Sequence, residues 1–149
     1  MGRKSRAARL SAAMEEYFAA EEILNEVKEM VITPEHYPPR KVAVEMIQDA
    51  VSRIESARNQ IEELHEEMES WASNMEGTNL ECTEKYSTIS VTVAVLNNAI
   101  DYLDVEVKSD EELLTMPDDV LACYLDEMID TIENADGECQ AAEFPGMFG

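Results

Sequence analysis

Apolar residues recur along most of the chain at alternating intervals of three and four positions, a pattern typical of helices that pack along a heptad seam. The first run covers residues 10–31 and stops before Thr33-Pro34, because a residue that precedes proline is disfavoured in the helical conformation. Further runs cover residues 43–75, 86–107 and 121–132. The spacing therefore predicts four helices.

The third run also carries a competing pattern. Four β-branched residues between Ile89 and Val95 alternate with other residues at a period of two, which is a strand signal. The helical rhythm, however, continues over residues 86–107, whereas the alternation stops at residue 95. We therefore expect a helix in this part of the chain.

Local signals mark where helices begin and end. Ser109 and Glu112 have the spacing of a capping box and predict the start of a short turn. Pro117, followed by two acidic residues, predicts the start of the fourth helix, because acidic side chains complement the positive end of the helix dipole. Gly137 is the expected end of that helix.

These elements predict an all-α fold. The short connection between the second and third helices makes them antiparallel neighbours. We expect an elongated antiparallel helical hairpin or coiled-coil bundle of about four helices, in which the first and fourth helices pack against the hairpin. The length predicts one domain over residues 1–149, with a basic head at 1–9 and a tail at 138–149.

The net charge limits the classes of molecule that the chain is expected to bind. The chain has 33 acidic and 11 basic residues, which gives a net charge of −22. Four of the basic residues, including Arg3 and Lys4, lie in the head, so residues 10–149 carry −26. Binding to nucleic acid or to an anionic membrane depends on Lys and Arg, so neither is expected of the chain as a whole. A charged partner should be basic.

The sequence has few candidate catalytic or metal-binding residues. Glu62-x-x-His65 matches one half of a di-iron motif, which needs two such pairs, and residues 132–143 resemble a calcium-binding loop without its first acidic ligand. Cys123 lies beside an apolar stripe and is expected to be packed. We therefore predict no catalytic residue, metal or cofactor, and a protein that is not an enzyme.

The cysteines and the apolar runs bear on localisation. Three cysteines without CxxC spacing favour a cytoplasmic protein without disulfides. No apolar run reaches 18 residues, so no membrane span is expected.

An acidic face on the second helix is the most distinctive feature. Its five carboxylates project around the seam over about 12 Å of helix, or about 2.4 Å per charge, which is close to the roughly 1.7 Å per charge of duplex DNA. The alternative is that these side chains only keep the helix soluble. The predicted acidic face consists of Glu62, Glu63, Glu66, Glu67 and Glu69. Secondary contacts are predicted at Asp118, Asp119, Arg3, Lys4, Arg6, Phe144 and Phe148.

Several short motifs of this sequence occur together in a known kind of protein. They are Ser5-Arg6-Ala7, Trp71-Ala72-Ser73-Asn74-Met75, Asn79-Leu80, Thr83-Glu84-Lys85-Tyr86, Leu96, Ala99, Ile100 and Leu103. With these motifs the sequence resembles small acidic helical proteins encoded by bacteriophages and prophages, over residues 3–14 and 55–105. It departs from them where Met75-Glu76-Gly77-Thr78 replaces the Leu-Pro-Glu portion of their turn. The resemblance implies phage origin and a helical fold but no activity.

Two functions remain as hypotheses. In the first, a phage-encoded interaction protein in the host cytoplasm uses its acidic helices to occupy a basic, nucleic-acid-binding surface on a host protein, such as a defence nuclease, and so acts as a DNA mimic. In the second, a structural or assembly protein self-associates through its heptad seams, for example as a homodimer. The charge distribution favours the first.

Overall fold

The computed structural model describes residues 5–32, 40–78, 80 and 83–145, and within these ranges all regular structure is helical. The predicted all-α fold is confirmed, with four long helices and one short helix that was expected only as a turn. The helices are α1 (Arg6–Ile32), α2 (Arg40–Met75), α3 (Glu84–Tyr102), α4 (Asp110–Thr115) and α5 (Asp118–Cys139).

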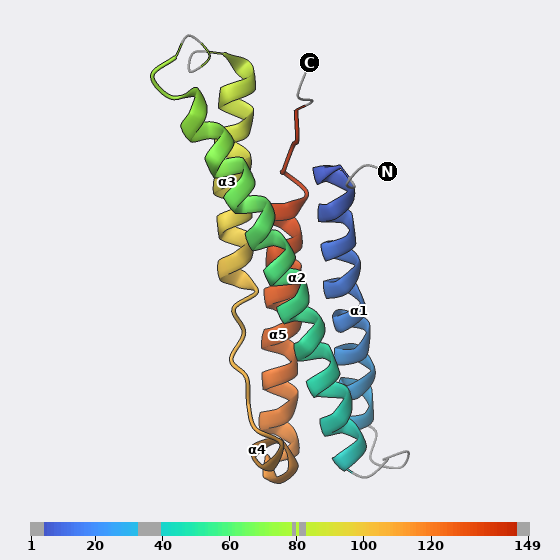
Figure 1. Cartoon of the computed structure of the whole chain (residues 1–149). Coiled ribbons are helices and arrows are strands. Elements are labelled where there is room, and N and C mark those ends of the chain that lie inside the picture. Colours follow the sequence, from blue (N-terminus) through green and yellow to red (C-terminus); the bar gives the residue numbers. More distant parts are fainter. Residues whose placement is uncertain (1–4, 33–39, 79, 81–82, 146–149) are drawn as a thin grey trace.

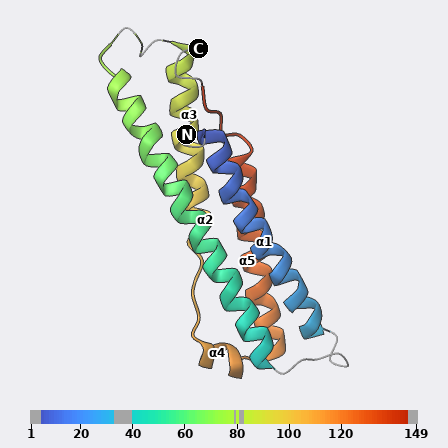
Figure 2. The same cartoon turned by 45° about the vertical axis from the view of Figure 1, so that its right-hand side comes forward.

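The four long helices form an elongated bundle in which each runs antiparallel to the one before it (Figure 1). The longest is α2, with 36 residues against 27 in α1. Its last turns therefore extend past the start of α1 and pair with α3 as a projecting hairpin (Figure 2). The short helix α4 lies at the opposite end of the bundle. The predicted hairpin of the second and third helices is thus present, and α1 and α5 complete the bundle.

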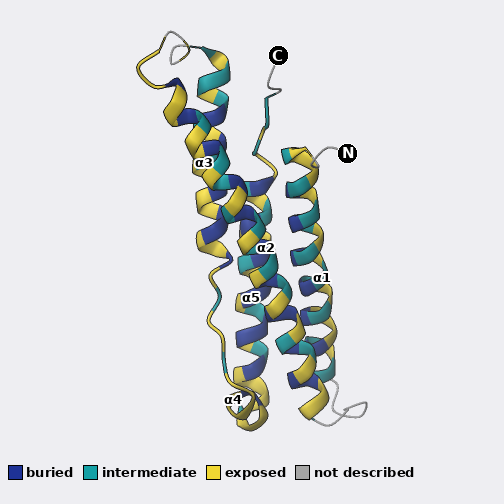
Figure 3. Cartoon of the chain, in the orientation of Figure 1, coloured by how far each residue is buried: buried dark blue, intermediate teal, exposed yellow. Residues whose placement is uncertain are grey.

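The predicted seams form the core. Buried residues lie along the inward sides of the helices, while exposed residues occupy the outer sides (Figure 3). Small residues on both α1 and α2 let these helices approach closely. On these two helices the fully buried alanines are Ala13, Ala20, Ala50 and Ala57, and Ala43 is 1% exposed. The seam predicted for the second helix, which includes Met68, Trp71 and Met75, differs at one position: Ala72 is buried, whereas Trp71 lies beside the seam and is only partly buried. In the third predicted seam, Tyr86 and Val93 are only partly buried and Val107 is exposed.

The third helix is shorter than predicted, because α3 ends at Tyr102 and residues 103–109 have no regular structure. Arg58 on α2 donates a hydrogen bond from Nε to the carbonyl oxygen of Ile100, at 3.2 Å, and so satisfies one of the carbonyls that a helix end leaves unpaired. Leu103 is buried and Val105 is partly buried. Leu103 fits both the heptad spacing and a buried position in an irregular segment, whereas Val107, the last residue of the predicted run, is exposed. The spacing alone therefore could not show that the helix ends at Tyr102.

Of the three helix boundaries predicted at α4 and α5, two are confirmed and one is wrong. The capping box is confirmed, because the Ser109 hydroxyl accepts from the Glu112 amide while the Glu112 side chain accepts from the Ser109 amide. The predicted start of the fourth helix after Pro117 is also confirmed. Its predicted end at Gly137 is wrong by two residues, because α5 continues to Cys139. Gly137 has ordinary helical geometry, and Cys139 is buried in the core.

Arg40, the first residue of α2, connects three elements. Its guanidinium donates to the carbonyl oxygens of Leu113 and Met116, at 2.9 and 2.7 Å, and forms an ion pair with the Asp118 carboxylate. It therefore joins the start of α2 to the end of α4 and the first turn of α5. Asp118, one of the predicted secondary contacts, has a structural partner within the chain.

The tail returns to the bundle. The Thr92 hydroxyl on α3 donates to the Glu143 carbonyl oxygen at 2.8 Å and accepts from the Glu143 amide at 3.0 Å. Phe144 is partly buried and packs against the core, so this predicted secondary contact is engaged within the chain. Arg3, Lys4 and Phe148 lie outside the described residues.

Replacing Thr92 with Val should destabilise the protein by about 1–2 kcal/mol, because the substitution keeps the shape of the side chain but leaves both backbone groups of Glu143 without their partner. Urea denaturation followed by circular dichroism would measure the loss. Thr88→Val, on the same helix at a half-buried position, is the control and should change stability by less than about 0.5 kcal/mol. Equal effects of the two substitutions would contradict the role given to Thr92.

Candidate functional site

The five glutamates of the predicted acidic face lie on the C-terminal half of α2, around the buried seam. Glu63, Glu66 and Glu69 are exposed, and Glu62 and Glu67 are partly buried. All five are outside the core, as predicted. The five carboxylates differ in their ion pairs, however, and those of Glu63 and Glu67 are with arginines of α1.

Two arginines of the basic head bind Glu67. Arg9 donates to Glu67 Oε1 at 2.9 Å, and Arg6 Nε donates to the same oxygen at 3.2 Å. The side chains of Arg9 and Glu67 are only 18% and 26% exposed, so the pair is partly shielded from water. The hydrogen bond to Glu67 raises the pKa of Arg9. The described part of the basic head is therefore folded against the acidic face, as the first turn of α1.

The remaining carboxylates divide into two groups. Glu62 pairs with Arg58 at 3.2 Å, and Glu63 lies 4.0 Å from Arg9. Within the described ranges, no basic nitrogen lies within 4.0 Å of Glu66 or Glu69. Among the described residues, two exposed carboxylates thus have no basic partner, beside three that are wholly or partly neutralised by arginines of this chain.

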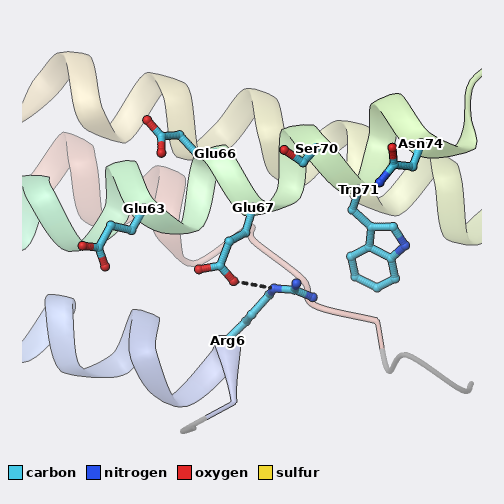
Figure 4. A pocket seen from close by; sticks show the side chains of 7 residues that line it. All are labelled: Arg6, Glu63, Glu66, Glu67, Ser70, Trp71 and Asn74. Atoms are coloured by element: carbon cyan, nitrogen blue, oxygen red, sulfur yellow. Dashed lines mark hydrogen bonds and ion pairs between the residues drawn. The ribbon is translucent and has the colours of Figure 1, made fainter.

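A groove of about 720 Å³ opens beside these residues, where α2 passes the N-terminal end of α1. Trp71 forms one end of the groove and the carboxylates lie along it (Figure 4). The guanidinium carbon of Arg6 is 5.0 Å from the centroid of the indole ring, and Lys85 Nζ is 5.3 Å from it, both within cation–π range. The lining residues are Arg6, Glu63, Glu66, Glu67, Ser70, Trp71 and Asn74.

A second acidic surface lies on α5, which has eight acidic residues and no basic residue among its 22. Asp118 pairs with Arg40, and Asp126 pairs with Lys28 on α1. The predicted secondary contact Asp119 is exposed, as are Glu127, Asp130 and Glu133, and within the described chain none of these four has an ion pair. The absence of Lys and Arg after residue 108 could have indicated this surface from the sequence.

The contact between α1 and α5 brings like charges together. Burial and the nearby carboxylates of Glu133 and Asp136 raise the pKa of Glu21. Asp136 accepts a hydrogen bond of 2.7 Å from the buried Tyr17 hydroxyl, and burial raises the pKa of that hydroxyl. The Tyr17 hydroxyl thus donates a hydrogen bond to one of the carboxylates that lie close together between α1 and α5.

The described structure does not bring together the residues of the other candidate sites. Residues 132–139 belong to α5, so the segment that resembles a calcium-binding loop is helical over most of its length. Across the described ranges, no group of three or more His, Cys, Asp or Glu side chains is arranged to hold a metal ion. The prediction for Cys123 is wrong, because its position on the outer side of α5 leaves it exposed. Of the two described cysteines, Cys139 is the buried one, and burial raises its pKa to about 11.

Comparison with protein-family models, curated proteins and solved structures finds no match. The resemblance to phage proteins therefore stays a prediction. None of the described helices combines the length and apolar character needed to span a membrane.

Replacing Arg9 with Gln should lower the free energy of unfolding by about 1 kcal/mol, because it leaves the partly buried Glu67 with one arginine fewer. Arg53→Gln is the matched control, since Arg53 is 40% exposed and lies 3.5 and 3.9 Å from its two carboxylate partners. Chemical denaturation at low and high salt would compare the two variants. A loss no larger than that of Arg53→Gln would contradict the role of the Arg9–Glu67 pair.

Replacing Glu21 with Gln should stabilise the protein at pH 7 by about 0.5 kcal/mol. The raised pKa means that the folded state holds this proton more tightly than the unfolded state, so stability falls as the pH rises through that pKa. The gain should disappear below the pKa of an unperturbed glutamate. Thermal unfolding across this pH range would measure it. The exposed neighbour Glu22→Gln is the control, and an equal gain from it would contradict the prediction.

Proposed function

We propose that this chain is a non-enzymatic interaction protein that binds a basic partner through the acidic end of α2. The observation that carries the proposal is the groove itself, whose lining combines the carboxylates of Glu63, Glu66 and Glu67 with the indole of Trp71. Carboxylates attract a basic surface, and tryptophan is enriched among the residues that contribute most to protein interfaces. The α5 surface has charge, but the described chain places no tryptophan beside it.

The partner is a nucleic-acid-binding protein of the host cell in which a phage encodes this chain. Such proteins bind phosphates through clusters of Lys and Arg, and those clusters are the surfaces that closely spaced carboxylates would occupy. Binding of this kind competes with nucleic acid and makes the chain a DNA mimic, as would suit inhibition of a defence nuclease. The support is the density and exposure of the carboxylates together with the net charge of −22.

Self-association through the heptad seams has less support. The seam residues of α2, including Ile47, Ile54 and Ile61, have no exposed surface and pack within one chain. A dimer built on these seams would have to open the bundle. Mass measurement in solution over a range of concentrations would test this alternative directly.

To test the proposal, the protein is immobilised, the host proteins that it retains are identified by mass spectrometry, and each is purified and bound to duplex DNA. Addition of the wild type should release the DNA. The affinity between the two proteins should fall at least about tenfold between 50 and 200 mM salt, because counterions compete for the charges. Replacement of Glu63, Glu66 and Glu69 by Gln should abolish the release.

The control replaces Glu127, Asp130 and Glu133 on α5 by their amides, which changes the net charge by the same amount at exposed positions. This variant should still release the DNA. A partner whose affinity is indifferent to salt would contradict the proposal. Loss of activity in the α5 variant, with activity kept in the α2 variant, would move the binding surface to α5.

A further inference from the structure

The contacts of Arg6 indicate what the groove binds. Its guanidinium approaches Trp71 at 5.0 Å and pairs with Glu67 at 3.2 Å, so one side chain combines an aromatic contact with a carboxylate contact. These are the two interactions by which proteins recognise arginine, whose planar cation both stacks on aromatic rings and pairs with carboxylates. Glu63 and Glu66 line the same groove and are exposed.

We propose that the groove receives an arginine side chain of the basic partner, and that Arg6 occupies this place in the free protein. The inference rests on the proposed function and identifies the group that the partner contributes. Charge complementarity supports this occupant, because three of the lining residues are carboxylates. The partner's arginine replaces Arg6 at Trp71 and Glu67, while Arg9 keeps its own contacts with Glu67.

The position of Arg6 makes the exchange feasible. Arg6 is the first residue of α1, and the first turn of a helix makes fewer backbone hydrogen bonds than its interior. Its side chain is 28% exposed, against 18% for Arg9. Withdrawal of Arg6 thus moves one partly exposed side chain and leaves the buried residues of α1, from Leu10 onward, in place.

The chain has one tryptophan, so intrinsic fluorescence reports directly on the groove. A short arginine–glycine peptide, added to the full-length protein, should change the emission of Trp71 in a saturable manner. A lysine–glycine peptide of equal length should bind more weakly, because an ammonium group lacks the planar surface of a guanidinium. Equal binding of the two peptides, or no change in emission, would overturn the inference.

Two arginine variants distinguish competition for the groove from a general effect of net charge. Arg6→Gln should bind the arginine peptide about threefold more tightly than the wild type, because the guanidinium that competes for Trp71 and Glu67 is gone, while Lys85 keeps its place near the ring. Arg9→Gln removes the same charge beside the same carboxylate, but Arg9 does not line the groove, so the gain should be clearly smaller. Circular dichroism would confirm that both variants are folded. An equal gain in both, or weaker binding by Arg6→Gln, would overturn the inference.

The two proposals fail in different ways. If the wild type releases DNA from its partner and the α2 carboxylates are needed, but Arg6→Gln gains no affinity for the peptide, only the arginine site is refuted. If the arginine peptide binds at Trp71 and no retained host protein releases DNA, the groove still recognises arginine and the proposed function is refuted.

Discussion

The antiparallel packing of α1 on α2 is the constraint on which the rest of the structure depends. The two helices are joined at Ile32 and Arg40 by a short connection, and buried alanines on both sides hold them close. Arg6 lies 26 residues before the end of α1, and Glu67 lies 27 residues after the start of α2. Antiparallel pairing therefore brings these two residues side by side, as their ion pair confirms.

The difference in helix length creates the candidate site. Because α2 is nine residues longer than α1, it continues for about 13 Å beyond the last point at which α1 can cover it. Trp71 lies in this uncovered part, beside the carboxylates that the first turn of α1 only partly neutralises. The groove is thus a consequence of register and length, and it forms without a dedicated loop.

The sequence predicted the helices well, because their seams depend on local spacing that a single chain displays. It also predicted the capping box at Ser109 and the start of α5 after Pro117. It could not predict that Glu67 would be paired with Arg6 and Arg9, because that contact depends on how α1 aligns with α2. The Arg58–Glu62 pair is different, because its i,i+4 spacing within α2 could have indicated it from the sequence. The position of Trp71 beside the seam was missed for a related reason: Ala72 fits the narrow core, and a three–four spacing admits either residue.

The scarcity of basic residues has a consequence for proteolysis. After Arg58 the chain contains only Lys85 and Lys108, and each lies over an aromatic ring, that of Trp71 or that of Tyr124. A protease that cleaves after lysine or arginine has no site in α4, α5 or the tail. Cleavage in the second half of the chain therefore requires one of these lysines to leave its ring, so that the rate of digestion measures local opening of α3 or of the segment that follows it.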